Sequence, residues 1–382
     1  MSIGREIRSA SPPFNFFMAT STSSTGAPPT AAESLLGLTL AGGWLVTERA
    51  ARAAGATGGT FSVGYFAERD GQRAFVKALD YAKAFSSTQA STPEILQYMT
   101  AAFTFEKAVL ERCREKKMRR VALPIATGSV DVAGSAAMSR VDFLILEVAE
   151  RDMRAHIDAS TDFDAAWRIR TLHQATSALR QLHAELIAHQ DLKPSNLLVF
   201  QNDGAKITDF GRSSRQGHAS PHDQICCAGD KGYSAPELLY GHELSDWKRR
   251  RLGNDVFMLG SLLHFLITST SATSAILSHL HSSHRPKNWA GSYADVLPYV
   301  REAFNRATVI FLETASKVVS PALAQNLTTI LCELCEPDPY LRGDPKNRGT
   351  HRDQLSLERY VTRFNVIASR LEMRLQSDAP VP

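Results

Sequence analysis

Four polar residues lie within a short stretch of the chain and could together act on a phosphate group. The segments HQDLKPSN at 189–196 and ITDFG at 207–211 contain them: Asp191, Lys193, Asn196 and Asp209. Phosphoryl transfer needs a carboxylate that orients the acceptor hydroxyl, a cation that neutralises the moving phosphoryl group, and oxygen ligands for Mg²⁺. These residue types therefore point to phosphoryl transfer.

Further motifs lie before and after this stretch in the chain. They are AFVKALD at 74–80, FEKAVLERC at 105–113, GYSAPELL at 232–239, NDVFMLG at 254–260 and EPDPYLRGDP at 336–345. In their residues and order these motifs resemble the eukaryotic-type serine/threonine protein kinases, and the resemblance covers roughly residues 43–350.

The resemblance implies a role for each residue of the catalytic stretch. Asp191 matches the aspartate that accepts the proton of the substrate hydroxyl, and Lys193 matches the lysine that contacts the γ-phosphate of ATP. Asn196 and Asp209 match the two Mg²⁺ ligands. We therefore expect ATP and Mg²⁺ to bind, with a protein as the phosphate acceptor.

Lys77 ends a predicted strand and matches the lysine that holds the α- and β-phosphates. Its expected partner is Glu106 on the following helix, and Glu111 is the competing candidate. Glu106 is preferred because Leu110, four residues further on, then falls where the family places an apolar residue beneath the glutamate.

The resemblance also implies a nucleotide site between two lobes. Residues 146–149 would form the hinge between the lobes, and a glycine-rich loop would cover the phosphates. Leu198 would pack beneath the adenine ring. The implied nucleotide contacts are Gly58, Gly59, Ser62, Lys77, the backbone of Glu147 and Ala149, and Leu198.

Two positions in this cleft depart from the family pattern. Ser62 stands where the next glycine of the loop is expected, which would reshape the lid over the phosphates. Phe75 stands two residues before Lys77, where the family usually has an alanine above the adenine. A phenyl ring there narrows the pocket unless the strand shifts.

Two further departures concern regulation and the acceptor. Gln190 replaces the arginine that normally receives the phosphate of a phosphorylated activation loop, so we expect activity without that phosphorylation. Asp230 replaces a threonine that touches the catalytic aspartate. Its carboxylate would repel Asp191 or pair with Lys193 or Lys231.

The C-terminal motifs imply two anchoring contacts. Glu237 is expected to pair with Arg342, which would fix the activation loop to the helical lobe. Asp255 is expected to hold the backbone of the catalytic loop while also starting a helix.

Hydrophobic periodicity predicts how the chain is organised. Residues 1–33, rich in Ser, Thr and Pro, are expected to be a disordered leader. The N-terminal lobe is expected at 34–149 and the C-terminal lobe at 150–350, with an insertion at about 268–320 and a C-terminal helix and tail at 351–382. Strands are predicted at 61–65, 73–79 and 141–149, and helices at 101–117, 164–188, 255–267, 321–335 and 354–376.

Composition narrows the class of protein. The 382 residues carry 43 basic and 39 acidic side chains, a net charge of +4, which gives no argument for nucleic-acid binding. The longest apolar run, 256–267, is too short to span a bilayer.

Five cysteines without a secretory signal favour a cytoplasmic protein with free thiols. The C-x-x-C pair at 332 and 335 is expected to pack in the core, and the basic runs 116–120 and 248–251 are expected to be solvated.

The sequence thus predicts an α+β, two-lobed protein-kinase fold, with a small antiparallel sheet and one helix above a mostly helical lobe. The predicted activity is transfer of the γ-phosphoryl group of Mg-ATP to serine or threonine hydroxyls of a protein. Two alternatives stay open: a pseudokinase that binds without turnover, and a small-molecule phosphotransferase on the same fold. The motifs GYSAPELL and Arg342 argue against the second, whereas the substrate, the pathway and the oligomeric state are not indicated.

Overall fold

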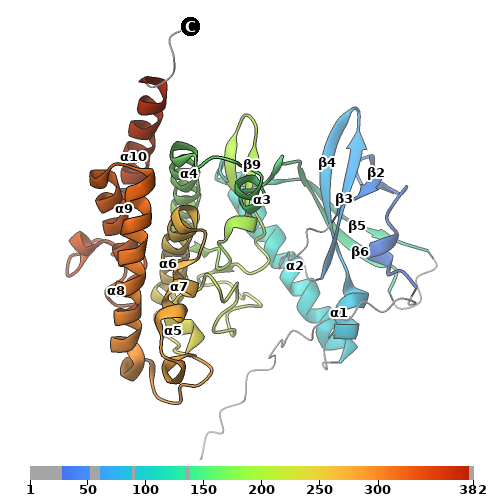
Figure 1. Cartoon of the computed structure of the whole chain (residues 1–382). Coiled ribbons are helices and arrows are strands. Elements are labelled where there is room, and N and C mark those ends of the chain that lie inside the picture. The colour runs from blue at the N-terminus through green and yellow to red at the C-terminus, as the bar shows by residue number, and fades with distance from the viewer. Residues whose placement is uncertain (1–27, 52–60, 88–90, 134–137, 378–382) are drawn as a thin grey trace, which may run out of the picture.

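The computed structural model describes residues 28–51, 61–87, 91–133 and 138–377. Figure 1 shows an N-terminal lobe built around a sheet on one side and a helical C-terminal lobe on the other, with α2 (Thr92–Glu115) running between them. This arrangement confirms the predicted α+β, two-lobed fold.

The N-terminal lobe contains one antiparallel sheet, whose strands lie in the order β1-β2-β3-β4-β6-β5. The predicted hairpin is confirmed, and Asp70 and Gly71 both have positive φ at its turn, where glycine is favoured. The strand bounds are β1 Thr39–Leu40, β2 Trp44–Arg49, β3 Ser62–Arg69, β4 Gln72–Leu79, β5 Pro124–Asp131 and β6 Arg140–Glu147.

The two faces of β4 serve different purposes because side chains alternate along a strand. Ala74, Val76 and Ala78 are fully buried on one face, in a cluster that includes Tyr65. Phe75 and Lys77 lie on the opposite face. The alternation therefore directs the lysine toward the C-terminal lobe.

Residues 28–33 belong to the predicted leader of 1–33, but they are ordered. The 3-10 turn η1 (Ala31–Ser34) packs on the buried face of the sheet, where Tyr65 Oη donates to the carbonyl of Ala32 at 2.7 Å. The predicted boundary is wrong because Thr30 and Glu33 form a capping box that orders this turn.

Two helices follow the hairpin, α1 (Tyr81–Ser87) and α2. Helix α2 begins earlier than the predicted residue 101, because Ser91 and Glu94 form a capping box and Pro93 occupies the first turn. Ile95 and Met99 on this first part pack against Leu79 and α1.

The C-terminal lobe is mainly helical, as predicted. Its helices are α3 Met153–Asp158, α4 Ala165–Ala184, α5 Pro236–Leu239, α6 Trp247–Thr268, α7 Ala272–His279, α8 Tyr293–Val318, α9 Pro321–Leu334 and α10 Glu358–Ser377, with 3-10 turns η2 Pro194–Asn196, η3 Ser282–His284 and η4 Pro345–Asn347. Its short strands are β7 Arg151–Asp152, β8 Ile187–Ala188, β9 Leu197–Phe200, β10 Gly204–Ile207 and β11 Ser214–Arg215.

Helix α6 lies at the centre of this lobe. Every residue from Arg251 to Ile267 is buried. The helix as a whole packs against α4, α7, α8 and α9. The predicted insertion at 268–320 forms α7 and α8, which complete the core around α6. Cys335 packs in this core against Gly260, as expected for that thiol.

Across the described ranges, no single helix has the length and apolarity needed to cross a membrane. Helices α6 and α7 meet that test only as a pair, which is bent by 81°.

Candidate active site

The catalytic loop, residues 189–196, is held by one buried carboxylate. Asp255 in α6 accepts the backbone N–H of His189 and the backbone N–H of Gln190, each at 2.7 Å. Asp255 has no exposed surface, and Gln190 adopts φ 65°, which costs a non-glycine residue about 1 kcal/mol. The carboxylate therefore stabilises the strained turn before Asp191, as the sequence predicts. The expectation that Asp255 starts its helix is wrong, because Asp246 caps α6 and the helix begins at Trp247.

Asn196 and Lys193 both contact Asp191, so three of the four residues predicted in the catalytic stretch lie together. Asn196 Nδ2 donates to Asp191 Oδ2 at 2.9 Å, and Lys193 Nζ lies 3.2 Å from the same oxygen. All three residues are buried. Burial raises the pKa of Asp191 above its ordinary value, and the charge of Lys193 opposes this shift. The result is an oriented carboxylate with a cation beside it.

Lys77 lies between two carboxylates from different elements. Its Nζ is 3.0 Å from Glu106 Oε1 on α2 and 2.9 Å from Asp209 Oδ1. The alternative partner, Glu111, is exposed and lies 3.8 Å from Lys107 instead. The predicted pairing with Glu106 therefore agrees with the geometry.

The charges in this cluster shift one another's pKa. Burial alone would lower the pKa of Lys77, but Asp209 and Glu106 outweigh it and raise this pKa. The charge of Lys77 lowers the pKa of Asp209, against the effect of burial. Burial raises the pKa of Glu106, whose negative form Lys77 favours. The lysine and Asp209 are thus held in their charged forms.

Asp209 lies at a sharp bend of the chain with φ 63°. A Cβ at Gly211 would lie 3.3 Å from Asp209 Oδ1, so glycine keeps the space beside the carboxylate open. The backbone N–H of Thr208 donates to the carbonyl of Asn196 at 3.0 Å, which places Asp209 next to the catalytic loop.

This donor set fits Mg²⁺. Asn196 uses its amide nitrogen on Asp191, so its oxygen is the atom that can bind a cation, and Asp209 contributes a carboxylate. Hard oxygen donors of this kind are the ligands that Mg²⁺ prefers. The described residues contain no group of three or more His, Cys, Asp or Glu that could hold a metal ion by themselves.

Of the predicted nucleotide-binding residues, Glu147, Ala149 and Leu198 lie beside the connection between the lobes. Glu147 ends β6, and its carboxylate accepts from Lys206 at 2.7 and 2.8 Å. Ala149 follows it, and Leu198 in β9 pairs in register with Asp152 just beyond. Ser62 begins β3 opposite Leu79. Gly58 and Gly59 lie outside the described residues.

Phe75 is accommodated without a shift of its strand. The register of β3 and β4 runs without a bulge, and the Phe75 ring lies against Gly64. A Cβ at position 64 would be 2.9 Å from Phe75 Cζ and 3.3 Å from the Cβ of Ala50. Glycine at 64 therefore provides the space that a phenyl group at 75 requires, which the sequence analysis did not recognise.

The activation segment, residues 210–237, contacts the catalytic loop directly. The backbone N–H of Asp230 donates to Asp191 Oδ1 at 2.7 Å, and the Asp230 carboxylate lies 3.4 Å from Lys193 Nζ. Of the alternatives for Asp230, the ion pair with Lys193 is the one formed. A side chain at Gly229 would collide with the carbonyl of Gln190, so close approach requires this glycine.

The end of the segment is fixed to the C-terminal lobe as predicted. Arg342 donates to both oxygens of Glu237 at 2.6 and 2.8 Å, and both side chains are almost fully buried. A bidentate pair of this kind holds both position and orientation.

Arg251 is a functional candidate that the sequence pattern did not indicate. The basic run 248–251 was expected to be solvated, but Arg251 is 1% exposed and contacts both the activation segment and Gln190. Arg251 lies one helical turn before Asp255, so the two side chains share a face of α6. That spacing was the available signal.

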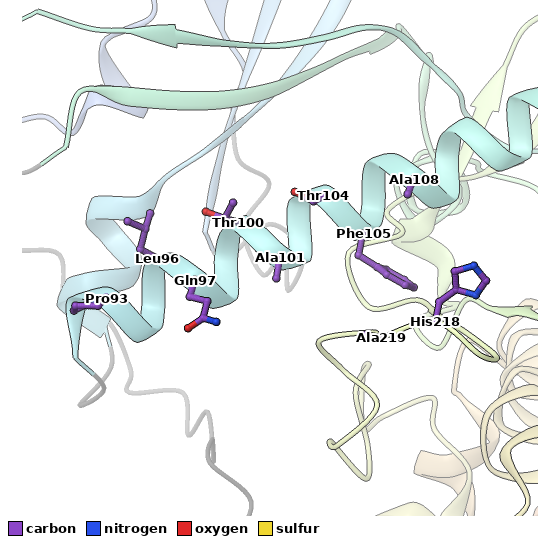
Figure 2. A pocket seen from close by; sticks show the side chains of 10 residues that line it. All are labelled: Pro93, Leu96, Gln97, Thr100, Ala101, Thr104, Phe105, Ala108, His218 and Ala219. Atoms are coloured by element: carbon purple, nitrogen blue, oxygen red, sulfur yellow. The ribbon is translucent and has the colours of Figure 1, made fainter.

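A groove lies between α2 and residues 218–219 (Figure 2). Apolar side chains including Leu96, Ala101, Phe105 and Ala108 line it, together with His218 of the activation segment. None of the phosphoryl-transfer residues lines this groove. It adjoins the activation segment rather than the site of Lys77.

Comparison with known proteins agrees with this geometry. The family model described as the protein kinase domain matches residues 107–351, more than half of the chain. The match begins after Lys77 and Glu106, so the structure alone identifies the N-terminal lobe contacts.

Several curated proteins are similar over part of the chain. Inactive serine/threonine-protein kinase PLK5 of Mus musculus is 30% identical over 150 residues, 37% of this chain and 23% of that protein. Maternal embryonic leucine zipper kinase of Danio rerio is 34% identical over 96 residues, 25% of this chain and 13% of that protein. Serine/threonine-protein kinase RAD53 of Saccharomyces cerevisiae is 34% identical over 104 residues, 25% of this chain and 12% of that protein.

The matched region spans less than a quarter of the length of each of these three relatives. The family match, the two-lobed fold and the contacts around Lys77 and Asp191 nevertheless agree. The chain belongs to the protein kinase family, of the eukaryotic serine/threonine type.

Proposed function

We propose that this protein transfers the γ-phosphoryl group of Mg-ATP to serine or threonine hydroxyls of a protein. The observation that carries the proposal is Lys77, which pairs with Glu106 and Asp209 while Asp209 adjoins the Asp191 loop. Those contacts join both lobes into one site whose groups match the requirements of phosphoryl transfer.

Each side chain has a chemical task in this proposal. Asp191 orients the acceptor hydroxyl and receives its proton, and the buried Lys193 compensates negative charge on the moving phosphoryl group. Lys77 orients the α- and β-phosphates. Asn196 and Asp209 would hold Mg²⁺, which supplies further neutralisation of phosphate charge.

A pseudokinase is the main alternative. One relative is described by its name as inactive, and Phe75 is atypical for the nucleotide pocket. Against this, Asp191 and Lys193 have no evident purpose in a module that only binds nucleotide, and Gly64 accommodates the ring of Phe75. A small-molecule phosphotransferase is less well supported, because the Glu237–Arg342 pair belongs to a peptide-binding segment.

We further propose that activity does not require phosphorylation of the activation segment. Gln190 lacks the positive charge that would bind a phosphate. In addition, all five hydroxyl-bearing residues of the activation segment are buried: Ser213, Ser214, Ser220, Tyr233 and Ser234. A kinase acting on this segment would therefore first have to displace it.

Substitution of two aspartates should separate metal binding from proton transfer. Asp209→Asn should abolish transfer, because an amide is a poor ligand for a hard cation. Asp191→Ala should lower kcat with little change in the KM for ATP. Peptide phosphorylation, the Kd for Mg-ATP and thermal melting are measured for each variant.

The matched control for this experiment is Asp203→Asn, since Asp203 is an exposed aspartate in the β9–β10 turn. Equal turnover in wild type and Asp209→Asn would contradict the assignment of Asp209. Wild-type protein that binds Mg-ATP but phosphorylates neither itself nor generic protein acceptors would favour the pseudokinase.

Exchanging the sizes of residues 64 and 75 tests whether the Phe75 ring, packed against Gly64, borders the adenine pocket. Gly64→Val should raise the KM for ATP by roughly tenfold, because overpacking pushes the Phe75 ring toward the base and costs about 1–3 kcal/mol. Phe75→Ala alone should change this KM with kcat nearly constant. The double variant should return the KM toward the wild-type value. Additive effects of the two substitutions would contradict a shared space.

Removal of phosphate tests the proposed independence from activation. Phosphatase-treated protein should keep most of its initial rate on a peptide, compared with mock-treated protein of known intact mass. A fall in rate of about an order of magnitude that is reversed by rephosphorylation would mean that another cation binds a phosphate on the segment.

A further inference from the structure

The buried Arg251 donates hydrogen bonds to two separate segments of the chain. Its Nη1 donates to Gln190 Oε1 at 2.7 Å and to the carbonyl of Ile225 at 3.1 Å. Its Nη2 donates to the carbonyls of Asp223 at 2.7 Å and His222 at 3.2 Å. One guanidinium therefore contacts the catalytic loop and the middle of the activation segment together.

Gln190 extends these contacts to the beginning of the segment. Its Nε2 donates to the carbonyl of Arg212 at 2.8 Å and to Ser214 Oγ at 2.7 Å. The amide thus uses its oxygen for Arg251 and its nitrogen for the segment. Gln190 is the residue immediately before Asp191, so these contacts act next to the catalytic carboxylate.

The contacts of Arg251 are mostly with neutral acceptors. The Asp223 carboxylate is 3.9 Å from Arg251 Nε, whereas the hydrogen bonds go to one amide and three carbonyls. Burying a charge is costly unless its donors are satisfied. The backbone of residues 222–225 therefore has to keep its present course around the guanidinium.

The same part of the segment reaches α2. His222 Nδ1 and Tyr98 Oη are hydrogen-bonded at 3.1 Å, and Tyr98 lies on the helix that carries Glu106. Figure 2 shows residues 218–219 of the segment beside this helix. The contacts of Arg251 consequently connect the catalytic loop, the activation segment and α2.

We propose that Arg251 is a positioning residue: through Gln190 it holds the activation segment on the catalytic loop and so maintains the geometry of Asp191 without a phosphate. This inference rests on the proposed kinase activity. It differs from a general role in stability because it predicts a loss in transfer that depends on Gln190 and leaves nucleotide binding intact.

A double-mutant cycle tests this inference in the full chain. Arg251→Ala and Gln190→Ala should each lower kcat for a peptide by roughly tenfold or more, with the Kd for Mg-ATP changed by less than about twofold. The double variant should lose no more than the more impaired single variant, because the two residues act as a unit.

The control is Arg249→Ala on the same helix, since Arg249 contacts the carbonyl of Tyr340 and Asp246 instead. It should keep the wild-type kcat. Losses that multiply in the double variant, or an unchanged kcat in both single variants, would overturn the role of Arg251. If Arg251→Ala melts below the assay temperature, Gln190→Ala carries the test, because it leaves the carbonyl contacts of Arg251 in place.

Limited proteolysis separates this inference from the proposed activity. Trypsin should cleave faster after Arg212, Arg215 and Lys231 in Arg251→Ala and Gln190→Ala than in the Arg249→Ala control. This readout does not depend on turnover. If the wild-type protein shows no kinase activity but the two variants are still cleaved faster, the role of Arg251 is supported and only the kinase proposal fails. Equal cleavage of all variants would overturn the role of Arg251.

Discussion

The buried face of helix α6 is the constraint on which the active site depends. Within five residues this face carries Arg251, Asn254 and Asp255, all almost completely buried. Asp255 holds the catalytic loop, Asn254 Oδ1 accepts the backbone N–H of Ala235 at 2.9 Å, and Arg251 holds residues 222–225. Because core helices enclose α6, the segments that it binds share one fixed reference. The position of Asp191 therefore follows from the packing of the C-terminal lobe.

The second constraint is electrostatic and joins the two lobes. Lys77 comes from the sheet, Glu106 from α2 and Asp209 from the position just before the activation segment. Lys77 balances only one of these two carboxylates, so the cluster retains negative charge that suits a divalent cation. The chemistry thus requires side chains of both lobes to meet, and the hydrogen bond between Tyr98 of α2 and His222 joins the lobes at a second point.

The sequence predicted the catalytic stretch, the hairpin and the Lys77–Glu106 pair because each depends on local spacing or on a motif. It did not predict Arg251, since the Gln190–Arg251 contact joins residues 61 positions apart and a basic run ordinarily favours solvent. Gly64 was missed for a related reason: its importance appears only when the Phe75 ring is seen against it on the neighbouring strand. Compensation between side chains across a fold cannot be recognised from either residue alone.

We propose that the site is assembled before any phosphorylation occurs. This proposal can be tested by the progress curve of peptide phosphorylation by protein whose intact mass shows no phosphate. We expect a linear curve from the earliest time point, with a rate proportional to protein concentration. A lag that shortens as protein concentration rises would contradict it, because such a lag means that one molecule must phosphorylate another before transfer to the peptide begins.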